Sequence, residues 1–271
     1  MSSTAPNVDP SIAPDVSAIV TEDDAPLINL YSEKQRRLLT TTLYASWNGP
    51  PPEEDGAART FLATANVGLF VSVREPPVVP DVMVSLDVDP HPEIWKKEHK
   101  SYFVWEFGKL PELAIEVVAN REGDELGAKR TRYRKMRVLH YVVWDPEGFL
   151  SDVPLQAFEL AGSVYRVMRT IYFDLLGLGL TVWHGEFEGL EADWLRWCDA
   201  DGRLLPMTSE RIESANARAD QESARAAQES ARATQEAARA DEERTRREAV
   251  ERERDALLAE VARLRESVSK S

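Results

Sequence analysis

Short apolar runs separated by turn residues alternate along the chain with stretches of helical spacing. Runs of four to nine residues, rich in Val, Leu, Ile and aromatic side chains, predict β-strands. These runs are residues 67–73, 80–88, 113–118, 141–144, 155–160 and 164–168. Helical spacing predicts helices over residues 32–47 and 122–137, and a short one over residues 193–197 whose tryptophans would cap the core. This succession of elements indicates an α/β fold.

A single charge interrupts the most apolar of these runs. Residues 113–118 read Leu-Ala-Ile-Glu-Val-Val, which is typical of a strand buried on both faces, and Glu116 lies in the middle. Burying a carboxylate without a partner costs several kcal/mol, so we expect Glu116 to be protonated, paired with a cation, or bound to a metal ion.

A second acid, Asp81, opens the run over residues 81–88 directly after Pro80. Strand alternation places Asp81 and Asp87 on the partly polar face of this run. If this strand and the Glu116 strand are neighbours, Asp81 and Glu116 can converge on one divalent cation, because magnesium prefers carboxylate and water oxygens. The alternative is that Asp81 is only a turn or strand-end residue after proline.

Lys129 occupies an unusual place on the predicted helix over residues 122–137. Leu126, Tyr133 and Met136 form its apolar stripe, and Lys129 falls within that stripe. A lysine facing the core needs an anionic neighbour, which Glu116, Asp81 or a substrate phosphate would supply. The alternative is that Lys129 snorkels to solvent along the edge of the helix.

The same helix carries a dense cluster of positive charge in an acidic protein. Six of nine consecutive positions are basic: Lys129, Arg130, Arg132, Arg134, Lys135 and Arg137. Such a cluster beside candidate metal ligands suits a polyanionic substrate, so Arg130, Arg132, Arg134 and Lys135 are candidate DNA-binding residues. The alternative is that these cations only complement the dipole at the C-terminus of the helix.

In order and spacing these motifs resemble the Uma-two family of restriction endonucleases, within the PD-(D/E)XK nuclease superfamily. The resemblance runs over residues 29–199 and rests on Pro80-Asp81, Glu116-Val117-Val118, Lys129, Tyr133 and the run at residues 141–146. It implies a restriction-endonuclease-like mixed sheet flanked by helices, with Asp81 and Glu116 as ligands of Mg²⁺ or Mn²⁺. It also implies DNA as the substrate.

The chain departs from the superfamily pattern at Val118, where a lysine is expected two residues after the second acid. The resemblance suggests that Lys129 takes this role from the following helix. Catalysis would then be metal-assisted hydrolysis of a phosphodiester, with Asp81, Glu116 and Lys129 as catalytic residues. Tyr133 and Asp87 are supporting candidates, although an aromatic residue at the position of Tyr133 is more often part of the core.

Two classes of function fit these residues. The first is a magnesium-dependent DNA endonuclease. The second is a non-catalytic nuclease fold that binds DNA or protein and oligomerises through its tail, and Val118 in place of lysine favours it. The two differ in whether a divalent cation stabilises the protein through Glu116.

Length, charge and cysteine content limit the domain number, the binding partners and the cellular compartment of the protein. The 271 residues suffice for one moderate domain plus an appendage, and the net charge of −14 argues against unspecific coating of nucleic acid or anionic membranes. The single cysteine, Cys198, excludes an intrachain disulfide and fits a reducing cytoplasm. No run approaches the ~20 apolar residues of a membrane span. We expect a disordered arm over residues 1–26 and a nuclease-like domain over residues 27–206.

The remaining residues, 207–271, predict one long helix because neither glycine nor proline interrupts them and opposite charges alternate along them. Residues 211–271 hold 13 basic and 14 acidic residues, so the negative charge of the protein lies elsewhere. Val250, Leu257, Val261, Leu264 and Val268 follow coiled-coil spacing, interrupted at Arg254. We expect a weak coiled coil that forms a homodimer; the alternative is a solitary charged helix.

Overall fold

A mixed sheet of six strands forms the centre of the globular part of the chain. The computed structural model describes residues 29–52, 56, 58–121 and 123–269, so the expected N-terminal arm over residues 1–26 lies outside the described residues. In sheet order the strands are β1 (Phe61–Ala65), β3 (Val82–Leu86), β5 (Leu113–Val117), β6 (His140–Trp144), β7 (Leu155–Ala161) and β8 (Val164–Val167). In this sheet β5 and β6 run parallel, and the four other pairs of neighbouring strands are antiparallel. The predicted α/β class and mixed sheet are confirmed.

The central strands are covered on both faces, as their apolar sequences predict. On β5, Leu113, Ile115 and Val117 join one hydrophobic cluster, whereas Ala114 joins the other. The first cluster also contains Leu39 and Leu43 of helix α1 (Leu30–Ser46), and the second contains Tyr133 of helix α3 (Arg130–Met136). Helices therefore cover opposite faces of the sheet, and alternation places Glu116 on the face covered by α3.

A second sheet of three strands packs against α1. One of its strands lies where the sequence predicted a short helix. It consists of β9 (Tyr172–Phe173), β10 (Leu178–Phe187) and β11 (Leu190–Cys198), so residues 193–197 form a strand and the predicted short helix is wrong. The pair β10 and β11 is closed by Glu188 and Gly189, both with positive φ, as a tight hairpin requires. Pairing with β10 along the whole of β11 supplies backbone partners that outweigh the local spacing of its tryptophans.

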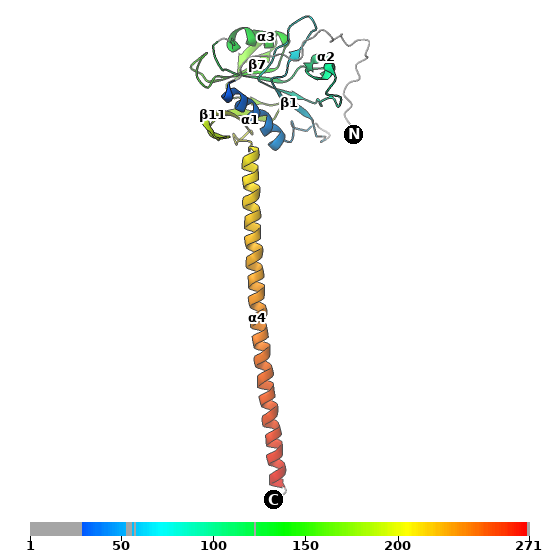
Figure 1. Cartoon of the computed structure of the whole chain (residues 1–271), viewed down its shortest axis with the longest axis vertical. Helices are drawn as coiled ribbons and strands as arrows, with labels where there is room; N and C mark the ends of the chain where they lie inside the picture. The colour runs from blue at the N-terminus through cyan, green and yellow to red at the C-terminus, as the bar shows by residue number, and fades with distance from the viewer. Residues whose placement is uncertain (1–28, 53–55, 57, 122, 270–271) are drawn as a thin grey trace. The chain divides into compact units, whose positions relative to one another are not determined.

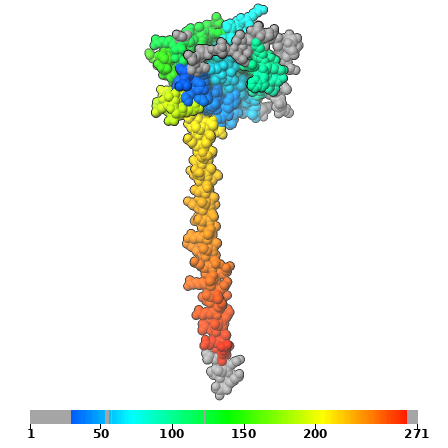
Figure 2. All heavy atoms as spheres, in the orientation of Figure 1, coloured from blue at the N-terminus to red at the C-terminus, as the bar shows by residue number. Residues whose placement is uncertain are grey.

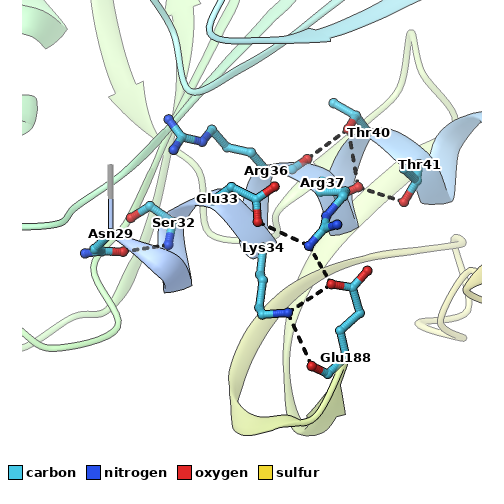
Figure 3. Close-up of polar contacts among 9 residues, drawn as sticks. All are labelled: Asn29, Ser32, Glu33, Lys34, Arg36, Arg37, Thr40, Thr41 and Glu188. Atoms are coloured by element: carbon cyan, nitrogen blue, oxygen red, sulfur yellow. Dashed lines mark hydrogen bonds and ion pairs between the residues drawn. The ribbon is translucent and has the colours of Figure 1, made fainter. Parts of the chain in front are cut away.

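Helix α1 is held against the edge of β11 by side chains. Asn29 caps the helix by accepting a hydrogen bond from the Ser32 amide at 2.7 Å. The buried Gln35 side chain donates to the Leu195 carbonyl and accepts from the Leu195 amide, both at 2.9 Å. On the exposed side, Lys34 and Arg37 bind Glu188 in the β10–β11 turn (Figure 3). One amide side chain thereby pairs both backbone groups of Leu195 on this edge strand.

The elements between β1 and β5 were only partly predicted. The run over residues 67–73 forms just β2 (Leu69–Phe70), which pairs in parallel with β4 (Tyr102–Phe103), and the edge strand β1 was not predicted. The segment before β5 also contains the short helices η1 (Lys97–His99) and α2 (Val104–Phe107). The sequence of β1, Phe-Leu-Ala-Thr-Ala, has one β-branched residue and two alanines, so its strand signal is weak. Pairing with the central neighbour β3 makes it a strand.

After the three-stranded sheet the chain forms one long helix, α4 (Thr208–Ser269), as predicted (Figure 1). The chain divides into two compact units between Ser209 and Glu210. None of the helices in the described part of the chain combines the length and apolar character needed to cross a membrane.

The contact between Gln35 and Leu195 gives a test of how α1 is anchored. We expect Gln35→Leu to lower the free energy of unfolding by about 3 kcal/mol, because it leaves a buried amide and a buried carbonyl without partners. Chemical denaturation followed by circular dichroism would measure this change. Thr41→Leu, on the exposed side of the same helix, is the matched control and should change stability by less than about 0.5 kcal/mol. Equal effects of the two substitutions would contradict this account of the anchor.

Candidate functional site

Neighbouring strands bring the two candidate acids together. Val82 at the start of β3 pairs with Ile115 of β5, so Asp81 lies just before β3 and Glu116 directly follows the paired residue. The Asp81 carboxylate accepts a hydrogen bond from the Val117 amide through Oδ2 at 2.8 Å. The condition on which the sequence prediction depended, that these strands are adjacent, is met.

Glu116 is a buried carboxyl group with two donors. Its exposed fraction is 1%, Lys129 Nζ lies 3.1 Å from Oε2, and the Tyr133 hydroxyl donates to Oε1 at 2.7 Å. Burial, and then the negative charge of Asp81, raise the pKa of Glu116 to about 8, although Lys129 and Tyr133 act in the opposite direction. The carboxyl group is therefore held in a position where its protonation changes near neutral pH.

A widened turn carries Lys129 to Glu116. Residues Glu125–Lys129 form the π-helical turn η2, in which the Lys129 amide donates to the Asp124 carbonyl at 3.2 Å. Asp124 caps this turn, and its carboxylate accepts from the Ala128 amide at 2.7 Å. The widened turn leads directly into α3, so Lys129 and Tyr133 lie one helical turn apart and both reach Glu116.

The Lys129 ammonium group lies between two carboxylates. It contacts Glu116 Oε2 at 3.1 Å and Glu125 Oε1 at 3.2 Å, and Glu125 is 5% exposed. Burial opposes the positive charge of Lys129, but Glu116, Glu125 and Asp81 together outweigh it and raise its pKa. Lys129 thus does not snorkel away from the sheet. It remains a cation at the site.

Asp81 has a cationic partner that the sequence prediction missed. Arg36 of α1 donates through Nη1 to Asp81 Oδ1 at 2.8 Å and to the side-chain oxygen of Asn66 at 2.6 Å. Arg36 is 5% exposed. A signal was present in the sequence, because Arg36 lies three residues before Leu39 and seven before Leu43, on the buried stripe of its helix.

Glu125 was missed as well, although it precedes Lys129 by four residues, the spacing of a helical ion pair. Its Oε2 atom is buried and has no hydrogen-bond partner within the ranges that the structure describes. The carboxylate fits against Gly123, where an added Cβ would lie 1.9 Å from Oε1. A side chain at position 123 would displace Glu125, so this glycine is part of the site.

The basic residues of α3 follow Lys129 along the chain, and three of them contact other parts of the protein. The Arg130 guanidinium lies over the Phe158 ring at 5.0 Å from its centroid, and Arg134 donates to the Ser163 carbonyl at 2.7 Å. Arg132 donates to the Pro76 carbonyl, and Lys135 is exposed. The structure thus gathers these cations on one helix and partly fixes three of them through protein contacts.

Asp87 is not brought to this site. It lies just after the opposite end of β3, has a φ of +57°, and forms two hydrogen bonds with Arg59 at 2.8 and 2.7 Å. The Arg59 partner lowers the pKa of Asp87. Asp87 therefore has a structural partner of its own.

The donor set agrees with a hard divalent cation that retains part of its water. Asp81 and Glu116 offer carboxylate oxygens, and magnesium sites are commonly built from one or two carboxylates, with water and substrate phosphate as the other ligands. Within the described residues there is no group of three or more His, Cys, Asp or Glu side chains placed to hold a metal ion. Any divalent cation at Asp81 and Glu116 would therefore have two carboxyl groups as its protein ligands.

Comparison with known proteins identifies one family. The model of the Uma2 family, described as "Putative restriction endonuclease", matches residues 26–153. The matched range includes α1, β3, β5 and α3, and with them Arg36, Asp81, Glu116 and Lys129. No curated protein and no solved structure gives a significant match.

The raised pKa of Glu116 predicts how stability depends on pH. The unfolded carboxyl group loses its proton near its ordinary pKa, whereas the folded one retains it up to about pH 8, so the folded state binds more protons in between. This contribution to stability is complete below the unfolded pKa and is lost as pH rises through 8. Between pH 5 and 8 the wild type should lose on the order of 3 kcal/mol relative to Glu116→Gln.

Urea denaturation of both proteins at several pH values measures this difference. Because the other titrating groups are common to the two proteins, their effects cancel when the curves are subtracted. Parallel curves for the wild type and Glu116→Gln would show that the folded carboxyl group ionises normally. The pKa assigned to Glu116 would then be wrong.

Proposed function

We propose, from the match of residues 26–153 to the Uma2 family, that the protein is a metal-dependent endonuclease that hydrolyses DNA phosphodiester bonds. The observation that carries the proposal is the arrangement of Asp81, Glu116 and Lys129. Two carboxyl groups from adjacent strands lie beside a lysine that is held as a cation. Carboxylates that can hold a metal and a nearby cation are the groups that phosphodiester hydrolysis requires.

Each residue has a separate part in this proposal. Asp81 and Glu116 would hold Mg²⁺ or Mn²⁺, which when bound polarises the phosphate and lowers the pKa of the attacking water. Since its pKa is raised, Lys129 would act through its charge, by orienting the water and stabilising negative charge on the phosphate. Tyr133 fixes Glu116 by its hydrogen bond and so orients a metal ligand.

Positive charge for the DNA would come from the same helix as Lys129. Arg130, Arg132, Arg134 and Lys135 lie on α3 next to the site, in a protein with a net charge of −14. A local cluster is what an acidic protein needs in order to bind a polyanion. The single cysteine fits the reducing cytoplasm, where such an enzyme would meet DNA.

The long helix α4 would join two copies of the protein. Its apolar side chains Val250, Leu257 and Val261 are 59%, 57% and 45% exposed in the single chain, and Figure 2 shows one face of this helix with its side chains. They are separated by seven and four residues, as the seam of a coiled coil requires. A two-fold dimer would place one active site on each strand of a DNA duplex.

A second function has one observation in its favour. Val118, at the position where the superfamily has a lysine, is 1% exposed and packs in the hydrophobic cluster under α3. A nuclease fold that has lost activity and binds DNA or protein as a scaffold would show the same replacement. The two candidates are separated by whether the purified protein cleaves DNA.

Cleavage of supercoiled plasmid with Mg²⁺ or Mn²⁺ tests the proposed activity. We expect the wild type to nick or linearise the plasmid, and Asp81→Ala, Glu116→Gln and Lys129→Ala to lower the rate at least 100-fold, because each removes a charge from the reacting centre. Glu159→Gln, an exposed acid on β7, is the control and should cleave like the wild type. Absence of cleavage by a folded wild type across both metals would favour the scaffold. Activity retained in Lys129→Ala would remove only the lysine from the mechanism.

Sedimentation equilibrium of the full chain tests the proposed dimer. The double substitution Leu257→Glu and Val261→Glu should weaken dimerisation at least tenfold, because it places charges in the seam. The control is Ala256→Glu with Ala259→Glu, which adds the same charges to positions outside the seam. A wild type that remains monomeric at tens of micromolar, or equal effects of the two pairs, would show that α4 does not associate in this way.

A further inference from the structure

Three cationic side chains of helix α1, Lys34, Arg36 and Arg37, point in different directions. Lys34 and Arg37 extend toward Glu188, whereas the Arg36 side chain leaves the helix in another direction (Figure 3). Arg36 has a side-chain exposure of 6%, compared with 42% for Arg37. One cation of α1 is therefore buried by the fold, while its neighbours bind at the surface.

Arg36 is fixed where it contacts the site. Its Nη1 atom is shared between Asp81 Oδ1 at 2.8 Å and Asn66 Oδ1 at 2.6 Å. Its Nη2 atom is buried and has no hydrogen-bond partner among the residues that the structure describes. Because α1 is packed on the sheet through Leu39 and Leu43, the backbone from which Arg36 reaches Asp81 is held by the core.

The two acids of the site are thus each paired with a protein cation, but in different ways. Lys129 has a side-chain exposure of 33% and two carboxylate partners, so its flexible end can move between them. Arg36 is more deeply buried and binds Asp81 Oδ1, whereas the Val117 amide binds the other oxygen, Oδ2. A divalent cation that binds Asp81 therefore binds next to a buried positive charge that is paired with the same carboxylate.

We propose that Arg36 is an internal counter-ion of Asp81 that weakens the binding of divalent cations at Asp81 and Glu116. Like charges close together in a partly buried site repel strongly, so the Arg36 charge raises the metal concentration that the site needs. When Asp81, Glu116 and Glu125 are all ionised, Arg36 and Lys129 leave the site with one net negative charge. A phosphate from the substrate would add the negative charge that a metal ion then meets.

This inference rests on the proposed function. The direction in which metal affinity changes when Arg36 is replaced distinguishes a counter-ion from a residue that only positions Asp81. If Arg36 only positions Asp81, the protein should bind metal less well once Arg36 is replaced, because the ligand Asp81 would lose its orientation. A counter-ion that competes with the metal gives the opposite sign. Tighter binding after loss of the arginine is therefore the diagnostic result.

Titration calorimetry of the full chain with Mn²⁺ alone tests the sign. Arg36→Met removes the charge and keeps the aliphatic stem, and Arg36→Gln removes the charge and keeps an amide donor for Asp81. Both should bind Mn²⁺ at least tenfold more tightly than the wild type, whereas Arg36→Lys should stay within about twofold because the charge remains. Arg37→Met, a neighbouring cation that binds Glu188, is the matched control and should leave the affinity unchanged.

The outcomes separate this inference from the function on which it rests. Equal or weaker Mn²⁺ binding by the folded neutral variants, with clear binding by the wild type, would overturn the role of Arg36 and leave the metal site intact. No binding by the wild type or by any variant would overturn both. Glu116→Gln should abolish the binding, and a variant that still binds like the wild type would place the metal elsewhere and also reject the inference. Circular dichroism confirms that each variant is folded.

Discussion

The burial of one carboxyl group, Glu116, in the centre of β5 is the constraint that organises this structure. A carboxyl group that is 1% exposed loses the solvation that would stabilise its charge, and the fold must replace it. Tyr133 and Lys129 replace part of it from the covering helix, at 2.7 and 3.1 Å, and burial still raises the pKa of Glu116 to about 8. Both side chains depend on the π-helical turn η2, which sets the rotation at which α3 begins. The position of α3 therefore determines which donors reach the Glu116 carboxyl group.

Most of the sheet and the centre of the site could be predicted from sequence because local pattern specified them. The apolar runs of β3, β5 and β6 need burial on both faces, and Lys129 and Tyr133 fall on an apolar helical stripe. The hairpin strand β11 could not be recognised, since Trp194 and Trp197 have a spacing that also suits a helix. Pairing with β10 across the turn at Glu188 and Gly189 decides between the two, and the spacing of the tryptophans does not show it.

Arg36 shows why a site is harder to predict than the strands that hold it. Its contact with Asp81 joins residues 45 positions apart, and nothing near Asp81 in the sequence indicates a cation. Glu125, by contrast, is local to Lys129 and could have been found from helical spacing alone. Asp81 and Glu116 were found although they are far apart in sequence, because each is an acid in or directly before an apolar strand run.

The part of the globular unit beyond residue 153 contributes to the site indirectly. The family match ends before β9, β10 and β11, yet these strands hold α1 through Gln35 and Leu195 and through the Trp197 indole, which donates to the Leu39 carbonyl at 2.9 Å. Tyr31 of α1 also joins the two sheets, because it accepts from the Trp144 indole and donates to the Asp193 carbonyl. Since α1 carries Arg36, the three-stranded sheet fixes the charge that faces Asp81. Substitutions in β11 can therefore alter the acids on β3 and β5 without touching either strand.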